Sequence, residues 1–206
     1  MKVVVISGGT SGMGKGVGEL FKKKGWVVVP FGKNPKDGEE MVDVTNEAQV
    51  ENFFNNVKEK YGKIDVLINS AGYGISGAAE LSDFNETKNL FDVNYFGALK
   101  CVQCALPLMK SGAKIINISS CCAIFPMPFR IHYCASKAAL SMLSYGLKME
   151  LSDAKIQVAV INPGDVKTNF INSRIKNFNT NERYQDRVKN AQALFYKNNS
   201  KRMSHE

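Results

Sequence analysis

Five short runs rich in β-branched residues recur along the chain, with helical patterns between them. The runs fall at residues 3–6, 26–29, 64–68, 114–118 and 156–161. Strands that alternate with helices favour βαβ units, and such units build a parallel sheet with helices packed on its faces. The sequence therefore predicts an α/β fold with a doubly wound parallel sheet, a Rossmann-like three-layer sandwich.

Composition and charge limit the kind of protein that this chain can be. No Pro/Gly/Ser-rich linker and no internal repeat divides the sequence, so we expect a single domain over residues 1–206. No apolar run approaches the roughly 18 residues that a membrane span requires, and the N-terminus lacks the basic region of a signal peptide. We therefore expect a cytoplasmic protein without a membrane partner. The net charge of +8 is concentrated in residues 167–206, but no nucleic-acid motif accompanies it, so we expect no nucleic-acid partner.

A glycine-rich stretch, Ile-Ser-Gly-Gly-Thr-Ser-Gly-Met-Gly-Lys-Gly at residues 6–16, follows the first run. A helix that begins after such a turn directs its free N–H groups and its positive dipole end at the turn, so we expect bound phosphate there. Two interpretations are open. The stretch contains most of a Walker A loop, but Gly16 stands where that loop needs Ser or Thr to bind magnesium. The spacing of Gly8, Gly12 and Gly14 instead suits a dinucleotide-binding turn.

Small and polar residues follow the later runs as well. Asn69 comes after the third run, Ser119 and Ser120 come after the fourth, and Pro163-Gly164 comes shortly after the fifth. In open parallel sheets, ligands bind outside the carboxyl ends of the strands. We therefore expect one ligand to cross several of these strand ends.

Tyr133 and Lys137 stand four residues apart at the start of a predicted helix, so they share one helix face. An ammonium close to a phenol favours the phenolate, and we therefore expect the pKa of Tyr133 to lie below its usual value of about 10. A phenol tuned in this way can act as an acid and a base near neutral pH. Ser120 precedes Tyr133 by 13 residues, whereas Ser119 is one residue out of step with this interval.

In combination, these features resemble the short-chain dehydrogenase/reductase family, and the similarity runs from residue 2 to about residue 170. The matching segments are Ser7–Gly14, Asp43-Val44, Asn69–Gly72, Asp92–Asn94, the Ser120 to Tyr133 interval and Pro163–Thr168. Ser replaces the family's Thr at the start of the glycine turn and its second Asn in the Asn69 segment. Both replacements are mild.

The resemblance implies an NAD(P)-dependent oxidoreductase that transfers hydride between a nicotinamide and a carbonyl compound or secondary alcohol. Tyr133 would be the acid/base, and Ser120 would hydrogen-bond the reacting oxygen. Lys137 would hold the nicotinamide ribose, and Asn94 would bind a water that extends the proton path. The implied cofactor-binding residues are Gly8, Thr10, Ser11, Gly12, Met13, Gly14, Asp43, Val44, Asn69, Ala71, Gly72, Tyr133, Lys137, Pro163, Gly164, Val166 and Thr168. No metal is needed, because the cofactor supplies the difficult chemistry.

The segment after the second run departs from the family pattern. It lacks the acidic residue that usually binds the adenosine ribose of NAD, and it offers Lys33, which could meet a 2′-phosphate. We therefore predict NADP as the preferred cofactor, with NAD as the alternative. Residues 30–43 also look too short for the helix that usually intervenes.

The end of the chain departs from the family pattern too. The sequence stops at Glu206, so we expect the usual last strand to be lacking or truncated. Residues 169–206 would form a substrate-covering or C-terminal segment, and association into a homo-oligomer stays open. Phe125, in the loop before the predicted catalytic tyrosine, and Phe170 would line the substrate site together with Ser120 and Tyr133.

These apolar side chains predict a mainly apolar ketone, aldehyde or secondary alcohol as the small-molecule substrate. Two other classes of protein stay open. The first is a phosphate-loop nucleotide hydrolase or kinase, and the second is a dinucleotide-binding regulator that has lost catalysis.

Overall fold

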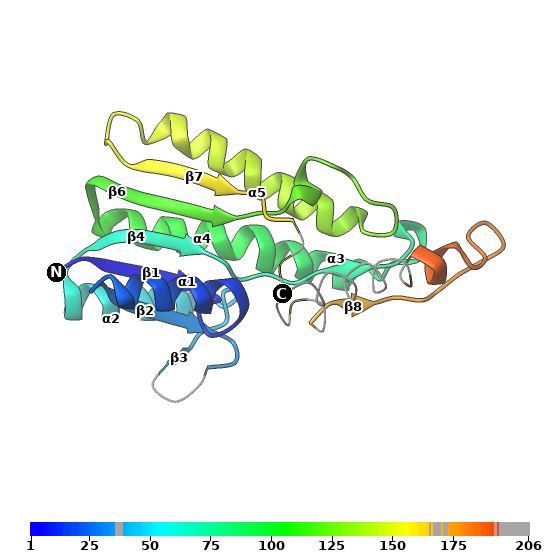
Figure 1. Cartoon of the computed structure of the whole chain (residues 1–206), viewed down its shortest axis with the longest axis horizontal. Helices are drawn as coiled ribbons and strands as arrows, with labels where there is room; N and C mark the ends of the chain where they lie inside the picture. The colour runs from blue at the N-terminus through cyan, green and yellow to red at the C-terminus, as the bar shows by residue number, and fades with distance from the viewer. Residues whose placement is uncertain (36–38, 165, 167–169, 171–172, 192, 194–206) are drawn as a thin grey trace.

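The computed structural model describes residues 1–35, 39–164, 166, 170, 173–191 and 193. Its main sheet has six parallel strands in the order β3-β2-β1-β4-β6-β7 (Figure 1). The strands are β1 (Val3–Ser7), β2 (Val27–Gly32), β3 (Glu40–Met41), β4 (Ile64–Asn69), β6 (Met109–Ile118) and β7 (Gln157–Ile161). The prediction of a Rossmann-like α/β fold is confirmed.

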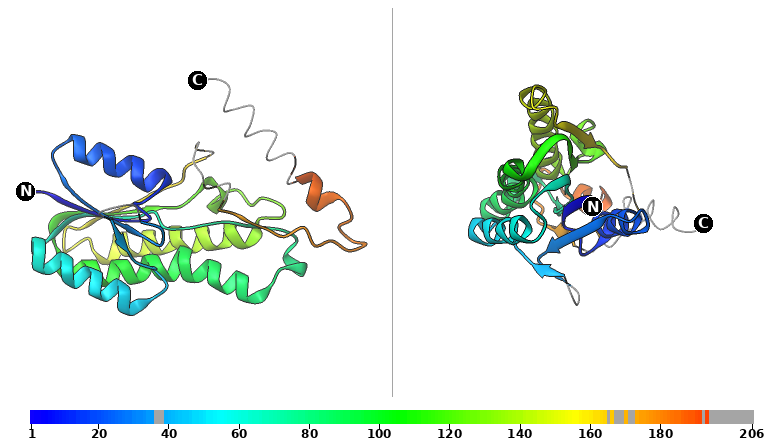
Figure 2. Two further views of the ribbon diagram at one scale, coloured as in Figure 1. Left: turned by 90° about the horizontal axis from the view of Figure 1, so that it is seen from below. Right: turned by 90° about the vertical axis from the view of Figure 1, so that its left-hand side faces the viewer.

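Helices cover both faces of this sheet, as Figure 2 shows. On one face lies α1 (Gly12–Lys23), and on the other lie α2 (Glu47–Tyr61), α4 (Gly97–Ala105) and α5 (Ile131–Glu150). Side chains alternate between the two faces of each strand, so neighbouring residues enter different layers. Val4, Ile6, Val66 and Ile68 pack toward α1, whereas Val5, Leu67 and Ile115 pack toward the other three helices.

Local sequence signals set the ends of α2. The Asn46 side chain accepts a hydrogen bond from the backbone N–H of Gln49 at 3.0 Å, which satisfies one of the free donors of the first turn. The helix ends at Gly62, whose φ of 67° lies in the left-handed region that favours glycine.

The helical region that follows Ser82 is interrupted in its middle. It begins as α3 (Phe84–Phe91), passes through the π-helical turn η2 (Asp92–Phe96) and continues as α4 and the short turn η3 (Leu106–Leu108). The π-helical turn contains Asn94, which is completely buried. Such turns are rare and often mark functional positions.

Three two-residue strands were not predicted from the sequence. One is β3, and the other two are β5 (Ile75–Ser76) and β8 (Ile175–Lys176), which form a small parallel sheet of their own. No helix occurs in the described part of residues 33–43, in line with the shortness of that segment.

The outer side of β7 is open in the described part of the chain. β7 is an edge strand of the main sheet, and Gln157, Ala159 and Ile161, which share one face of β7, are exposed. The expectation of a missing or truncated last strand stays a prediction, because the residues after 193 lie outside the described part of the chain. Among the described residues, no helix has both the length and the apolar composition that crossing a membrane requires.

Candidate active site

The strand order places the candidate site at the carboxyl edge of the sheet. When the strands of the main sheet are numbered without the small β5, their order is 3-2-1-4-5-6, and the strand order reverses between β1 and β4, which are parallel neighbours. Ligands bind at such reversal points, outside the carboxyl ends of the strands. Ser7 at the end of β1 lies opposite Asn69 at the end of β4, and Asn69 lies opposite Asn117 near the end of β6.

The glycine turn between β1 and α1 is packed too tightly for side chains. Gly8 has a φ of 64°, and a Cβ built on it would lie 2.7 Å from the backbone nitrogen of Ala71. A Cβ on Gly14 would lie 2.4 Å from the carbonyl oxygen of Gly8. Gly12 also has a positive φ, of 52°. The turn therefore depends on glycine at all three predicted positions.

The N-terminus of α1 faces this turn and fits a pyrophosphate. Its N-cap residue, Ser11, makes no side-chain hydrogen bond to the helix, so the first N–H groups of α1 are not capped by a side chain. Free helical N–H groups and the helix dipole together bind anionic groups. Thr10 is buried against the end of β2, where its Oγ1 would lie 2.8 Å from a Cβ on Gly32. Met13 instead packs into the core beneath the turn.

Lys33 and Asp43, both predicted on the adenosine side, form an ion pair. Lys33 Nζ lies 3.0 Å from Asp43 Oδ2, and the Lys33 side chain stays 76% exposed. Burial raises the pKa of Asp43, but hydrogen bonds from Thr45 and Lys33 outweigh it and leave the pKa below its usual value. Next to Asp43, Val44 is buried and would lie 2.7 Å from a Cβ on Gly97, so its side chain belongs to the core.

The side chain of Asn69 lies inside the sheet edge and does not project from it. Its Nδ2 donates to Asn117 Oδ1 at 2.9 Å, and its Oδ1 accepts from Ser7 Oγ at 3.4 Å. Asn117 in turn donates to Ser144 Oγ on α5 at 2.9 Å. This buried network ties β1, β4, β6 and α5 together. Ser7 Oγ also accepts from the backbone N–H groups of Ser70 and Ala71 at 3.2 and 3.4 Å, so the network fixes the backbone next to the glycine turn.

Lys137 is buried behind the ends of β4 and β6. Its Nζ donates to the carbonyl oxygen of Ile118 at 2.9 Å, and burial lowers its pKa to about 8. A Cβ on Gly72 would lie 3.3 Å from Lys137 Nζ and 2.9 Å from Asn94 Oδ1. Lys137 and Asn94 thus both lie next to Gly72.

The amide of Asn94 is fixed by three hydrogen bonds. Its Nδ2 donates to the carbonyl oxygen of Tyr73 at 3.0 Å and to Ser136 Oγ at 3.0 Å. Its Oδ1 accepts from the backbone N–H of Tyr73 at 3.1 Å. Asn94 therefore joins η2, α5 and the segment after β4, and so holds Gly72 beside Lys137.

Tyr133 is buried at the start of α5, and Ser120 lies against it. Burial raises the pKa of Tyr133 to about 12, while a hydrogen bond with Ser120 and the charge of Arg174 lower it to a lesser extent. The expected decrease of this pKa is therefore wrong for the chain by itself. The cause is that burial outweighs nearby charge, and the Lys137 ammonium points to a backbone carbonyl instead.

The two neighbouring serines have different surroundings. Ser119 Oγ donates to the carbonyl oxygen of Lys137 at 2.8 Å and accepts from Ser141 Oγ at 2.9 Å, so it fastens β6 to α5. Ser120 Oγ accepts from the backbone N–H of Cys122 at 3.2 Å, which leaves its own proton for another acceptor. Of the two hydroxyls, the one predicted from the 13-residue interval is placed to serve Tyr133.

Of the two phenylalanines predicted at the substrate site, one lies next to the phenol. The Phe170 ring lies 5.8 Å from the Tyr133 ring, whereas Phe125 is 68% exposed in the loop between η4 (Cys121–Ala123) and α5. Beyond β7, Pro163 accepts from the backbone N–H of Cys121 at 3.0 Å, and Val166 is exposed. Gly164 has room around it, and Thr168 lies outside the described residues.

Two residues at the edge of the site were missed by the sequence reasoning. Asn117 belongs to the buried network described above, and its position two residues before Ser119 is the one sequence signal that could have indicated it. Arg174 is only 9% exposed and affects the pKa of Tyr133. No local pattern predicts its position, because it depends on the pairing of β8 with β5.

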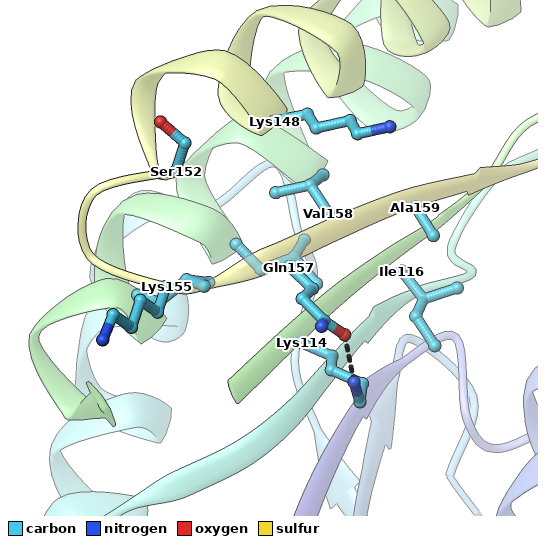
Figure 3. Close-up of a pocket in the computed structure, with 10 residues that line it drawn as sticks. Lys114, Ile116, Lys148, Ser152, Lys155, Gln157, Val158 and Ala159 are labelled. Carbon is cyan, nitrogen blue, oxygen red and sulfur yellow. Dashed lines mark hydrogen bonds between the residues drawn. The ribbon is translucent and has the colours of Figure 1, made fainter. Parts of the chain in front are cut away.

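The described residues also form a cavity away from the candidate site. A cavity of about 540 Å³, shown in Figure 3, is lined by Lys114, Lys148, Ser152, Lys155 and the start of β7. It lies at the amino end of β7, opposite to the carboxyl edge that holds the candidate site. No group of three or more His, Cys, Asp or Glu side chains in the described part of the chain could hold a metal ion.

Comparison with known sequences identifies relatives along most of the chain. A family model described as short chain dehydrogenase matches residues 2–178. A 3-ketodihydrosphingosine reductase of Bacteroides thetaiotaomicron is 34% identical over 182 residues, covering 84% of this chain and 67% of the relative. A probable short-chain type dehydrogenase/reductase, VdlC, of Helicobacter pylori is 38% identical over 157 residues, covering 75% of this chain and 58% of the relative. The chain thus spans about two thirds or less of the length of these two relatives.

Comparison with solved structures supports the same assignment. A short-chain dehydrogenase from Streptomyces avermitilis superposes with a TM-score of 0.85 at 28% identity, covering 95% of this chain and 78% of that chain. An aldohexose dehydrogenase from Thermoplasma acidophilum superposes with a TM-score of 0.77 at 27% identity, covering 82% of this chain and 69% of that chain.

Proposed function

The chain belongs to the short-chain dehydrogenase/reductase family of NAD(P)-dependent oxidoreductases, and on this premise we propose that Tyr133 is its acid/base and that a mainly apolar carbonyl compound or secondary alcohol is its substrate. The observation that carries the proposal is the meeting of Ser120, Tyr133 and Lys137 at the same sheet edge as the glycine turn. Ser120 follows the end of β6, and Tyr133 and Lys137 both lie in the first turns of α5.

The residues of the chain handle the reacting oxygen and its proton. When bound, the nicotinamide supplies or accepts the hydride. The Tyr133 hydroxyl gives its proton to the carbonyl oxygen during reduction and takes it back during oxidation. Ser120 donates a hydrogen bond to the same oxygen and stabilises the charge that develops there, because its contact with the Cys122 N–H does not use the hydroxyl proton.

Lys137 and Asn94 carry the proton between Tyr133 and solvent. The pKa of Lys137 is lowered by burial to about 8, which suits proton exchange near neutral pH. Its ammonium also lies close enough to Gly72 to bind a ribose hydroxyl of the cofactor. Asn94 holds the Gly72 segment and a water next to the ammonium. A bound ribose and water would bring hydrogen-bond donors to the phenol oxygen, which stabilise the phenolate, and so would lower the pKa of Tyr133 from its value in the chain alone.

NADP is the proposed preferred cofactor because Lys33 stands at the adenosine side of the site. Its side chain is largely exposed and is therefore accessible to a 2′-phosphate. Asp43, its partner, would share the ammonium with that phosphate. The glycine turn and the N-terminus of α1 would hold the pyrophosphate, which both NAD and NADP possess.

An apolar substrate body is supported by Phe170 beside the phenol and by the exposed side chains of the loop before α5. Phe125 and Ile124 are 68% and 58% exposed, so they can contact a ligand rather than the core. The relatives do not decide the substrate, because one is named for a keto compound and another for an aldohexose.

Replacement of the phenol tests the proposed role directly. Tyr133→Phe should lower kcat by at least about a hundredfold, the usual worth of a general acid–base group, and leave the dissociation constant for NADPH nearly unchanged. Tyr145→Phe is a matched control, because Tyr145 lies on the same helix but is 48% exposed. More than about a tenth of wild-type turnover in the Tyr133 variant would remove Tyr133 from this role.

Two further measurements test the remaining parts of the proposal. A panel of carbonyl compounds of graded polarity should show its highest kcat/KM for apolar ketones or aldehydes, and a maximum for a sugar or a dicarboxylate would contradict the apolar site. Titration with NADPH, NADH and ATP separates this enzyme from a phosphate-loop hydrolase or kinase. Tight cofactor binding without turnover of any compound would favour a regulator that has lost catalysis.

A further inference from the structure

Two buried thiols lie beside the groups that are proposed to carry the reaction. Cys122 is in the turn η4, two residues after Ser120, and Cys134 directly follows Tyr133 at the start of α5. They are 7% and 4% exposed, and both pack in the same small apolar cluster as Tyr133. The two thiols hydrogen-bond each other, so the turn and the helix meet at these sulfur atoms.

The surroundings of this pair favour a thiolate on Cys134. The hydrogen bond from the Cys122 thiol lowers the pKa of Cys134, and the charge of Arg130 also lowers it; together they outweigh burial, which raises this pKa. Cys134 also lies in the first turn of α5, where the helix dipole favours a negative charge. The pKa of Cys122 is raised, chiefly by its hydrogen bond with Cys134. The pair therefore combines a thiol that ionises readily with one that keeps its proton.

Met127, in the loop before α5, contacts the pair from the solvent side. Its Sδ lies 3.4 Å from Cys122 Sγ, and Arg130 Nη1 approaches the same Sδ at 3.7 Å. Met127 is 36% exposed, and Ile124 and Phe125 in the same loop are more exposed still. Movement of the Met127 side chain would therefore admit a small reagent to the thiols.

A second pair of cysteines, Cys101 and Cys104, offers a contrast. These residues stand three positions apart on α4, so they are also neighbours on one helix face. Burial raises the pKa of both thiols, and neither therefore supplies a thiolate near neutral pH. Because the thiolate is the nucleophile that attacks an oxidant, the α4 pair is expected to stay reduced where the pair of Cys122 and Cys134 reacts.

We propose that Cys122 and Cys134 form a modification site at which a hydroperoxide oxidises the two thiols to a disulfide that stops turnover; the effect on turnover rests on the proposed function of Tyr133. The Cys134 thiolate attacks a peroxide oxygen, the O–O bond breaks, and the leaving alkoxide or hydroxide takes up a proton from solvent. Cys134 is then a sulfenic acid, whose sulfur has given two electrons to the peroxide. The Cys122 sulfur attacks this sulfur, the S–O bond breaks, and the oxygen leaves as water with the proton of Cys122.

Such a disulfide would displace the groups that handle the reacting oxygen. An S–S bond is about 2 Å long, which is shorter than a hydrogen bond between thiols, so its formation draws η4 toward α5. The backbone N–H of Cys122 donates to Ser120 Oγ at 3.2 Å, and Ser120 would therefore shift together with η4. A misplacement of about 1 Å among reacting groups can lower a rate by about a hundredfold.

Peptide mapping of the whole chain detects the disulfide without any substrate. Trypsin cuts after Arg130 and so separates the two cysteines into peptides of residues 115–130 and 131–137. After brief treatment with hydrogen peroxide and alkylation of the remaining thiols, mass spectrometry should show these peptides joined, and dithiothreitol should separate them. Cys121→Ser should give the same joined peptides, which assigns the bond to Cys122.

Turnover measures the effect of the disulfide on the candidate active site. With a carbonyl compound that the wild type reduces with NADPH, peroxide treatment should lower kcat by at least about tenfold, and dithiothreitol should restore it. Cys134→Ser cannot form the disulfide, so the same treatment should change its kcat by less than about twofold relative to its own untreated sample. Cys104→Ser is the matched control and should respond to peroxide as the wild type does.

The contrary results separate the modification site from the proposed function. Absence of the joined peptides would overturn the site, as would a disulfide between Cys101 and Cys104 in its place. A loss of turnover that persists in Cys134→Ser, or that dithiothreitol does not reverse, would point to another target such as Met127 and overturn the switch. A disulfide that leaves turnover unchanged would overturn its effect on Tyr133. Joined peptides in a protein that turns over no compound would retain the modification site and reject the proposed function.

Discussion

Gly14 and Gly16 offer a matched pair of substitutions in the first turns of α1. Both are helical glycines, two residues apart, and replacement by Ala adds the same methyl group to each. At Gly16 a Cβ would meet nothing within 4 Å, whereas at Gly14 it would lie 2.4 Å from the Gly8 carbonyl oxygen. An unstrained carbon–oxygen contact is about 3.3 Å, so the turn would have to move by about 1 Å.

The magnitude follows from two opposing contributions. Replacing an unstrained helical glycine by Ala raises the free energy of unfolding by about 0.5–1 kcal/mol, and this gain is common to both variants. Overpacking against a rigid backbone costs about 1–3 kcal/mol and applies to Gly14→Ala alone. We therefore expect Gly16→Ala to be more stable than the wild type, and Gly14→Ala to be about 1–3 kcal/mol less stable than Gly16→Ala.

Urea unfolding followed by the fluorescence of Trp26 measures this difference. Trp26 is the one tryptophan in the sequence and packs against Phe21 of α1 at 4.9 Å, so it reports on this layer. NADPH titration of the same variants should show weaker binding for Gly14→Ala, because the displaced carbonyl belongs to the proposed pyrophosphate site. Midpoints that are equal, or higher for Gly14→Ala, would refute the close packing of the turn.

Two other predictions concern charged side chains. Lys33→Ala should weaken NADPH binding by about fivefold and leave NADH binding within about twofold, as measured by fluorescence titration; an equal change for both cofactors would show that Lys33 does not meet the 2′-phosphate. Lys137→Met should remove a rise in the free energy of unfolding of the wild type between about pH 8 and pH 10.5, followed by urea unfolding at each pH; parallel curves for the two proteins would contradict the lowered pKa of Lys137.

Periodic patterns and short-range spacing made most of the fold predictable. The β-branched runs became β1, β2, β4, β6 and β7, because buried parallel strands are nearly continuous in apolar residues. The pair Tyr133 and Lys137 was predictable as well, since a separation of four residues in a helix fixes one face. The position of the candidate site at the carboxyl edge of the sheet was also predictable, because ligands bind outside the carboxyl ends of parallel strands.

Features that depend on long-range pairing were not predictable from the sequence. The two residues of β5 have no local strand signal, and they pair with residues 100 positions later in β8. Arg174 is placed by that pairing, so it was missed. Asn69 was expected to bind the cofactor, yet its side chain is used between β1, β4 and β6. Motif matching identifies such a position but not the direction in which its side chain points.

The charge state of Lys137 shows why local reasoning about the Tyr133 pKa was incomplete. A lysine whose pKa falls to about 8 on folding, from an ordinary 10.5, binds fewer protons when folded than when unfolded between these pH values. Stability therefore rises with pH across this window, and below about pH 8 the protein carries the full cost of a buried ammonium, on the order of 3 kcal/mol.

Tyr133 changes the stability in the opposite direction as pH rises. Its pKa is raised from 10 to about 12, so the folded chain keeps this proton at a pH at which the unfolded chain has already lost it. Tyr133 therefore lowers the stability as pH rises above 10. At neutral pH the chain thus holds a costly ammonium beside Gly72 and Asn94 and a phenol that is fully protonated. The ammonium of Lys137 lowers the stability, so stability does not explain why it is buried there. The proposed function does explain it, because the ammonium would bind a ribose and a water and would pass a proton toward Tyr133.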